Sequence, residues 1–186
     1  MRKLKSYTDA GSPGRDWNVA TGMVMDGKAA FQIMGDWAKG EFSAKGLKPG
    51  KDYYCSPTPS NKGYLYNVDS FVFYNVKGAD KLEGQKLLAS LIMGKNFQKV
   101  FNMYKGSIPA RLDVSMADFD DCAKKSNADL NAASAAGGLM PSYAHGMALK
   151  GAQSGAITDV VTEHFNSNMS SKDAAKKLAA AVKASL

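Results

Sequence analysis

Apolar residues recur at every third or fourth position in several stretches of the chain, which is the pattern of amphipathic helices. Residues 113–134 alternate acids with small apolar groups and indicate an interrupted helix, and Ser170 and Ser171 can cap a last one. The other predicted helices cover residues 15–25, 80–93, 96–104 and about 147–165. The second half of the chain is therefore expected to be mostly helical.

Three shorter stretches predict β-strands, because they are rich in apolar, β-branched or aromatic residues and are bounded by glycines and prolines. They are residues 29–34, 52–56 and 64–76, and a turn at residues 61–63 precedes the last of them. A helix, three strands and then mostly helices indicate an α/β fold in which helices cover a small sheet. The helical part is long for so few strands, which suggests a piece of a larger protein.

The strand at residues 29–34 is expected to end in a sharp corner. Gly35 lets the backbone turn, and Asp36 is a good N-cap for the residues that follow. Trp37 is then presented at the start of a helix. This indole either anchors the corner by burial, since tryptophan is largely buried on average, or it is displayed for a ligand.

A polar interruption breaks the apolar pattern of residues 64–76. In a continuous strand, Asn67 and Asp69 would point to the same face. Two polar side chains with acceptor oxygens would then lie together inside a hydrophobic stretch. The alternative is a bulge or a strand end, where such side chains bond to the local backbone.

Composition narrows the classes of protein. A length of 186 residues, 45% of them hydrophobic and 22% charged, fits one ordinary domain or two small lobes. No apolar run is long enough to cross a membrane, and the basic start lacks the apolar segment of an export signal. The net charge of +7 comes from scattered lysines rather than from arginine clusters with interleaved aromatics, so we expect no nucleic-acid surface.

Candidate catalytic and metal-ligating residues are few. Cys55 and Cys122 lack the spacing of a metal site and are either free thiols or a disulfide. No nucleophile elbow or phosphate-binding loop occurs, so no enzyme, cofactor or metal site is predicted. His164 falls within a helix, at the surface or the edge of the core, whereas His145 follows Pro141 at a loop-to-helix junction, where binding residues are common.

Residues 27–42 resemble a segment of the bacterial family 1 extracellular solute-binding proteins, of the maltose-binding-protein type. The match is closest to the glucose/mannose-binding subgroup that serves ABC sugar importers. Residues 64–71, 105–111 and 141–146 resemble the same subgroup in the same order. The resemblance covers nearly the whole chain.

The resemblance implies a partial α/β fold of the periplasmic-binding-protein type II-like class, with segments of the N-terminal lobe missing. Residues 1–63 would belong to the C-terminal lobe and residues 64–105 to the N-terminal lobe. Residues 106–111 would form a hinge crossover, and residues 112–186 would supply helices of the C-terminal lobe.

The resemblance also implies a sugar site between the lobes. The faces of a pyranose carry C–H groups and its rim carries hydroxyls, so a flat aromatic with charged or amide partners is a suitable set. A glycosidase would need a paired acid and base, and the implied set holds one carboxylate. The implied residues are Asn67, Asp69, Lys105 and His145, with Trp17 or Trp37 stacking on the ring.

The implied function is capture of a monosaccharide, glucose or mannose, without catalysis and without a cofactor. The partners would be the sugar, the membrane permease subunits of the transporter and the missing N-terminal half, in the periplasm. That compartment permits disulfides, which favours a bridge between Cys55 and Cys122. The alternatives are a fragment of a carbohydrate-acting enzyme and a helical interaction module without its own ligand.

Overall fold

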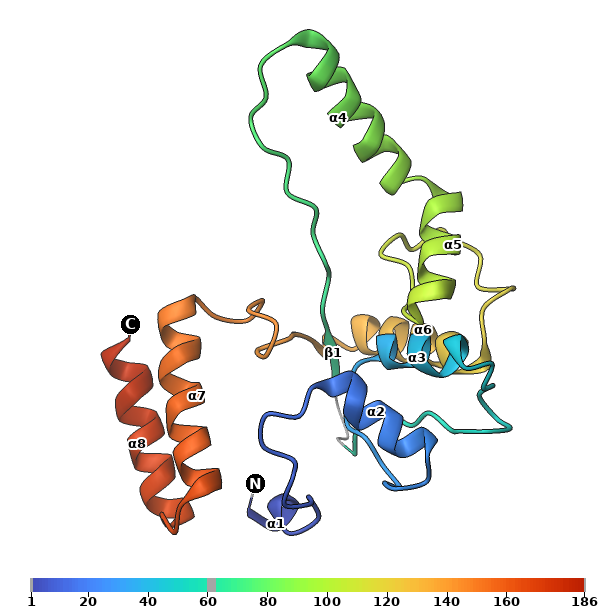
Figure 1. The fold of residues 1–186 in the computed structure, drawn as a ribbon. Coiled ribbons are helices and arrows are strands. Elements are labelled where there is room, and N and C mark those ends of the chain that lie inside the picture. The colour runs from blue at the N-terminus through green and yellow to red at the C-terminus, as the bar shows by residue number, and fades with distance from the viewer. Residues whose placement is uncertain (1, 60–62, 186) are drawn as a thin grey trace. The chain divides into compact units, whose positions relative to one another are not determined.

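The computed structural model describes residues 2–59 and 63–185, in which helices dominate (Figure 1). The turn expected at residues 61–63 therefore lies, except for Gly63, outside the described residues. The elements in chain order are α1 (Arg2–Lys5), α2 (Trp17–Met25), the 3-10 helix η1 (Asp36–Ala38), α3 (Lys39–Ala44), β1 (Tyr64–Tyr66), α4 (Ala79–Ile92), α5 (Lys95–Lys105), α6 (Asp121–Ala135), β2 (Leu139–Pro141), α7 (Gly151–Asn166) and α8 (Ser171–Ala184).

Most of the predicted helices are present. The helices α2, α4 and α5 begin and end within two residues of their predicted positions. Ser170 caps α8, since its side chain accepts a hydrogen bond from the amide of Asp173. Of the interrupted helix predicted at residues 113–134, the structure forms α6, which begins at Asp121 because Asp120 caps it. The helix α7 begins at Gly151, later than the predicted start at about residue 147.

The strand predictions were largely wrong. Residues 29–34 are extended but form no strand, and residues 52–56 contain a single bridge, between Pro49 and Tyr53. Of residues 64–76, β1 alone is a strand. Apolar and β-branched composition favours extended backbone, but a strand also needs a neighbour to accept its hydrogen bonds. Within the described residues, β1 and β2 supply that pairing as a two-stranded parallel sheet.

The chain divides into two compact units. Unit 1 comprises Met1–Arg15, Leu65–Asn67 and Met140–Leu186, and unit 2 comprises Asp16–Tyr64 and Val68–Leu139. The lobe boundaries predicted from the resemblance concern a longer protein and stay a prediction.

Unit 1 is built on the antiparallel pair of α7 and α8 (Figure 1). Val160, His164 and Ala174 are buried between these helices, and a cavity of about 230 Å³ lies beside them. His164, predicted at the surface or the edge of the core, is thus 9% exposed. The Lys5 ammonium donates to the Phe165 carbonyl at 2.9 Å, which ties the N-terminal segment to the end of α7.

Unit 2 has a small apolar core around the start of α6. Val114, Phe119 and Ala123 are buried, and Ile108 and Met116 pack against them. This core joins α6 to the segment that follows α5. The rings of Phe42 and Tyr53 form a separate, tilted pair, with centroids 4.2 Å apart.

Residues 29–34 are held without strand pairing, through the side chain of Gln32. Its amide nitrogen donates to the Trp17 carbonyl at 3.0 Å, and its oxygen accepts from the hydroxyl of Thr21 at 2.8 Å. Thr21 is fully buried, so these bonds satisfy groups that water does not reach. The neighbouring Phe31 remains 91% exposed.

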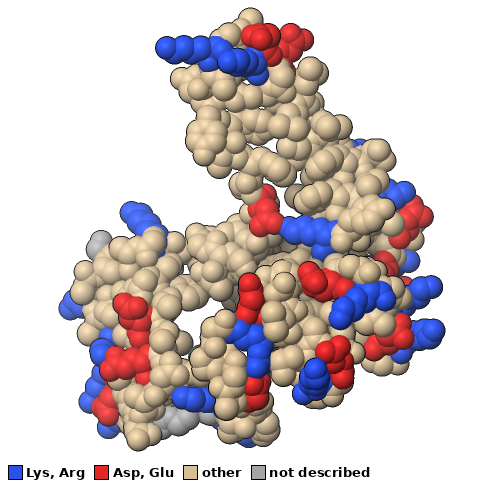
Figure 2. All heavy atoms as spheres, viewed as in Figure 1, with Lys and Arg blue, Asp and Glu red and all other residues tan. Residues whose placement is uncertain are grey.

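A long apolar surface of unit 2 faces solvent. It consists of α4 and residues 68–76, which we call the α4 arm. Leu87, Leu91 and Val72 are 65%, 60% and 73% exposed. Over the α4 arm, the face drawn in Figure 2 carries few charged side chains apart from a group at its far end. Within the described residues, no helix is long and apolar enough to cross a membrane.

Candidate functional site

Gly35 begins the corner that carries Trp37. A methyl group at Gly35 would lie 2.1 Å from Cζ3 of Trp37, so the indole packs directly on the glycine backbone. The N-cap of η1 is Gly35 rather than Asp36, which corrects the sequence prediction. The carboxylate of Asp36 accepts instead from the distant amide of Ile108 at 3.2 Å.

Asp36 is a half-buried acid. Burial raises the pKa of its carboxyl above the usual range, against the opposing effects of a hydrogen bond with Ser107 and of the nearby charges of Lys39 and Lys105. Ser107 is itself buried, 9% exposed. The carboxyl group therefore joins the corner to the residues directly after α5.

The corner and the end of α5 are in close contact. Gly106 has φ +86°, and a methyl group there would lie 2.6 Å from the amide nitrogen of Gly40. A methyl group at Gly40 would in turn lie 2.9 Å from the carbonyl oxygen of Lys105. Two of the stretches that carry the resemblance, residues 27–42 and 105–111, are thus packed backbone to backbone.

Lys105 and Asp69, both predicted as polar partners, form an ion pair with each other. Their side chains are 30% and 61% exposed, so the pair lies at the surface of unit 2. The ammonium of Lys105 also lies 6.0 Å from the ring centroid of Phe101. The pair offers N–H donors and carboxylate acceptors side by side, which suits a hydroxyl that both donates and accepts.

Trp17, the other candidate indole, is the first residue of α2. Asp16 caps this helix by accepting from the Trp17 amide at 2.8 Å. The Trp17 residue is 37% exposed, whereas Trp37 is half-buried. Both candidate indoles lie in unit 2.

Asn67 and His145 lie in unit 1, near the same end of the sheet. Asn67 follows the last residue of β1, Tyr66, whose carbonyl accepts from the Ser142 amide at 2.8 Å. The Ser142 hydroxyl hydrogen-bonds Nδ1 of His145 at 2.7 Å. β1 ends before Asn67, so the longer strand that would carry Asn67 and Asp69 on one face is not formed, and Asp69 pairs with the distant Lys105.

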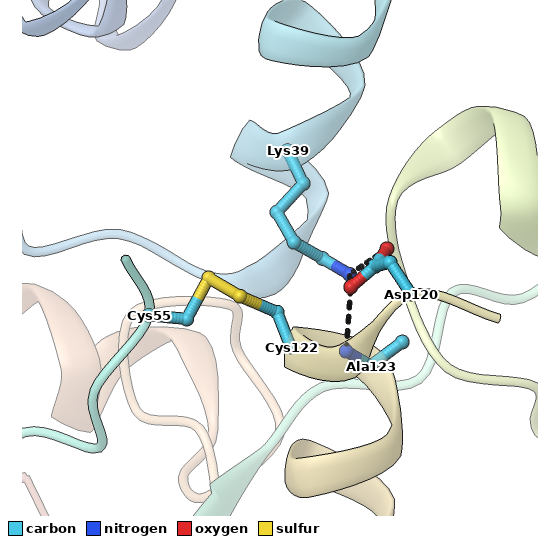
Figure 3. Close-up of a disulfide and its surroundings, with 5 residues drawn as sticks. All are labelled: Lys39, Cys55, Asp120, Cys122 and Ala123. Carbon is cyan, nitrogen blue, oxygen red and sulfur yellow. Dashed lines mark hydrogen bonds and ion pairs between the residues drawn. A yellow bond between two sulfur atoms is a disulfide. The ribbon is translucent and has the colours of Figure 1, made fainter. Parts of the chain in front are cut away.

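A buried ion pair that the sequence did not reveal supports the corner from the other side. The Lys39 side chain is 6% exposed, and its ammonium lies 2.8 Å from Oδ2 of Asp120 (Figure 3). Oδ1 of Asp120 accepts from the Ala123 amide, which caps α6. Lysine and aspartate distant in sequence and outside any motif gave no signal that they would pair.

A disulfide joins Cys55 to Cys122 in the first turn of α6, with Cα atoms 5.7 Å apart (Figure 3). This is the pairing that the resemblance favoured. It ties the loop that carries Tyr53 to the helix that Asp120 caps. Desolvation, with a smaller effect of the Asp120 charge, raises the pKa of Tyr53 to about 12.

Arg111 fastens the far end of the 105–111 stretch. Its guanidinium donates twice to the Asp113 carboxylate, at 2.8 Å for each bond, and once to the Met93 carbonyl at 3.1 Å. The hydrogen bonds from Arg111, together with Lys95, hold the pKa of Asp113 well below its usual range. These bonds tie residues 111–113 to the residue that follows α4.

These residues supply hydrogen-bond donors, hydrogen-bond acceptors and indole rings. Among the described residues, no group of three or more histidines, cysteines, aspartates or glutamates could hold a metal ion. The structure brings Trp37, Lys105 and Asp69 into unit 2 on connected elements and places Asn67 and His145 together in unit 1. Amide, imidazole, ammonium and carboxylate groups with indoles can bind a small polyhydroxylated molecule.

No protein-family model matches the chain. A protein of Brucella suis biovar 1 (strain 1330), named "Probable sugar-binding periplasmic protein", is 49% identical over 185 residues, which are 99% of this chain and 44% of the relative. A protein of Rhizobium meliloti (strain 1021) with the same name is 46% identical, with the same coverage of both chains. The xylose/arabinose-binding protein XacG of Haloferax volcanii is 30% identical over 96% of this chain and 38% of its own length. The chain thus spans less than half the length of the curated relatives it matches.

Proposed function

We propose that this chain is a segment of the sugar-binding protein of an ABC transporter, which captures a monosaccharide in the periplasm for import. The observation that carries the proposal is similarity over 99% of the chain, at 49% identity, to a relative named as a sugar-binding periplasmic protein. Identity at this level over 185 residues supports a shared fold and a related kind of ligand. The permease subunits in the membrane would be the partners that receive the sugar.

The proposed architecture is a partial fold of the periplasmic-binding-protein type II-like class. The exposed α4 arm supports it, because an apolar surface of this extent is ordinarily covered in a folded protein. The segments that would cover it belong to the part of the longer protein that this chain does not contain. In the proposed division, residues 64–105 lie with the N-terminal lobe, residues 106–111 form the hinge crossover, and residues 1–63 and 112–186 belong to the C-terminal lobe.

The proposed site joins the residues predicted from the resemblance. One indole, Trp37 or Trp17, would stack on the apolar face of the ring. The polar partners would then select among sugars, since a misplaced hydroxyl leaves a buried group unpaired. These partners are Asn67, Asp69, Lys105 and His145.

We propose a hexose, glucose or mannose, as the ligand. Because one relative is named for binding xylose and arabinose, these two pentoses are the sugars to compare with glucose and mannose in a binding experiment. The proposed role is binding without chemistry, because the site pairs no acid with a base in the way that glycoside hydrolysis requires. Domain closure around the sugar would present the loaded form to the permease.

A titration tests this function. The chain is joined to the part of the Brucella suis protein that lies outside the matched 185 residues, and tryptophan emission is followed during addition of glucose, mannose, xylose or arabinose. We expect saturable binding of one hexose, weakened about tenfold or more by Trp37→Ala and by His145→Ala. The matched control is His164→Gln, which alters the histidine beside the cavity of unit 1 and leaves affinity unchanged.

The enzyme alternative is tested in the same sample. Incubation with oligosaccharides, followed by chromatography, detects released products. Hydrolysis that depends on Asp69 would favour an enzyme over a binding protein. Absence of binding to every monosaccharide in the titration would count against the proposed function itself.

A further inference from the structure

We propose that Asp36 is a positioning residue, whose half-buried carboxyl group ties the corner that carries Trp37 to the end of α5 that carries Lys105. No motif assigns it this role. The inference rests on the proposed function for its effect on sugar affinity. The structural link itself can be tested without any sugar.

The hydrogen bonds of Asp36 reach the opposite side of the junction. Its carboxylate accepts from the amide of Ile108 at 3.2 Å and bonds the hydroxyl of Ser107. Ser107 is buried and Ile108 is half-buried, so water does not readily replace a lost acceptor. Removing the carboxyl group would free the residues after α5 to shift.

Asp36 connects the two candidate binding groups, the indole of Trp37 and the ammonium of Lys105, through covalent and hydrogen bonds. Trp37 follows it in η1, and its indole packs on Gly35, the residue before it. Lys105 lies two residues before Ser107 in the chain. A change at Asp36 therefore moves the indole and the ammonium relative to each other.

Other contacts hold the two segments of the junction together. Gly40 and Gly106 are in backbone contact, and Lys39 is fixed by Asp120. These contacts keep the segments together, whereas Asp36 links the turn of η1 to the residues that follow Gly106. Asp36 thus sets the orientation of the turn that carries Trp37, whereas the backbone contact of Gly40 with Gly106 keeps the two segments together.

The test separates the hydrogen bonds of Asp36 from its charge. Burial raises the pKa of the carboxyl group, whereas its hydrogen bonds and the charges of Lys39 and Lys105 act in the opposite direction. An asparagine amide has the same shape, can accept from the Ile108 amide and can donate to the Ser107 hydroxyl. Asp36→Asn is therefore the conservative variant and Asp36→Ala the disruptive one.

The first arm of the test uses the 186-residue chain without sugar. A Trp17→Phe background leaves Trp37 as the single tryptophan, and the emission of Trp37 and the amide resonance of Ile108 are recorded. We expect Asp36→Ala to shift both signals and Asp36→Asn to leave both close to the parent. The matched control is Ile92→Ala, which removes a buried side chain elsewhere in unit 2 and lowers stability without moving the Trp37 emission.

The second arm measures sugar affinity in the chain joined to the remainder of the Brucella suis relative, with Trp17 retained. We expect Asp36→Ala to weaken binding by about tenfold or more, and Asp36→Asn by about threefold or less. If both variants weaken binding equally while the Trp37 emission is unchanged, Asp36 contacts the sugar directly and the positioning role is overturned. It is also overturned if Asp36→Ala behaves like Ile92→Ala in the first arm. If no protein binds sugar but the first arm gives the expected shifts, the proposed function fails and the positioning role stands.

Discussion

Buried polar side chains fix the corner at residues 35–40 more than apolar ones do. Lys39 and Ser107 are buried, and Asp36 is half-buried, at a junction where glycines bring two backbones together. The sequence predicted the corner from Gly35, Asp36 and Trp37, but it assigned Asp36 a local cap. The actual partner, Ile108, is 72 residues away, and a contact at that separation leaves no local pattern to read.

The pair of Lys39 and Asp120 gives the first prediction at this scale. Lys39→Met removes one charge of a largely buried pair and keeps the length of the side chain. We expect a loss of about 2 kcal/mol in the free energy of unfolding, below the range for fully buried pairs, because Asp120 is 34% exposed. Urea denaturation measures it. Lys45→Met, at an exposed position of the same segment, is the control and should change stability by less than about 0.5 kcal/mol.

Replacing Gly106 or Gly84 by alanine should change the free energy of unfolding in opposite directions. Gly106→Ala places a side chain at φ +86° and 2.6 Å from the Gly40 amide, so we expect a loss of about 2 kcal/mol or more. Gly84 lies inside α4 with open space around it, and Gly84→Ala should stabilise by about 0.5–1 kcal/mol. Thermal unfolding followed by circular dichroism compares them. Equal effects of the two substitutions would show that the backbone contact at Gly106 is not close.

The sequence predicted the helices correctly and most of the strands wrongly, because a helix forms from neighbouring residues whereas a strand needs a partner from elsewhere in the chain. The apolar stripes that predict α2, α4 and α5 and the cap at Ser170 are local, so the residues that form each helix are close in sequence. A strand at residues 29–34 or 67–76 needs a partner from elsewhere, and the described residues hold none in pairing register. Candidate site residues at a helix end or in a turn, such as Lys105 and His145, did not follow from periodicity.

The disulfide between Cys55 and Cys122 should contribute to the stability of the chain. Cys55 and Cys122 are 67 residues apart, and closing a loop of that size stabilises by about 4 kcal/mol in the chain-entropy model. Replacing both cysteines by serine should lower the free energy of unfolding by about 2–4 kcal/mol. The urea midpoint of the double variant measures this loss, and the reduced parent chain is the control that should match it. An unchanged midpoint would mean that the loop and α6 hold together without the bridge.

For the whole molecule, the exposed apolar surface of the α4 arm is the feature that we expect to govern self-association. The arm exposes leucines and aromatics that a complete protein would cover, so we expect the isolated chain to self-associate. Leu87→Lys with Leu91→Lys should weaken association about tenfold in sedimentation experiments. Leu4→Lys adds charge at an exposed leucine of unit 1 and should leave association unchanged. Association that resists the α4 substitutions would place the contact on another surface.

The proposed function is also a statement about the whole molecule, because the chain spans 44% of the Brucella suis relative. Its candidate groups are divided between the two units, with Trp37, Asp69 and Lys105 in one and Asn67 and His145 in the other. We therefore expect sugar binding to depend on the remainder of the longer protein.

Isothermal titration calorimetry of the chain, with and without that remainder, tests the central claim most directly. We predict weak or undetectable heat when glucose or mannose is added to the chain alone, and micromolar or tighter binding once the remainder of the protein is joined to it. Tight binding by the isolated chain would contradict the claim that its site is incomplete. Absence of heat with every monosaccharide in the joined protein would contradict the claim that it captures sugar.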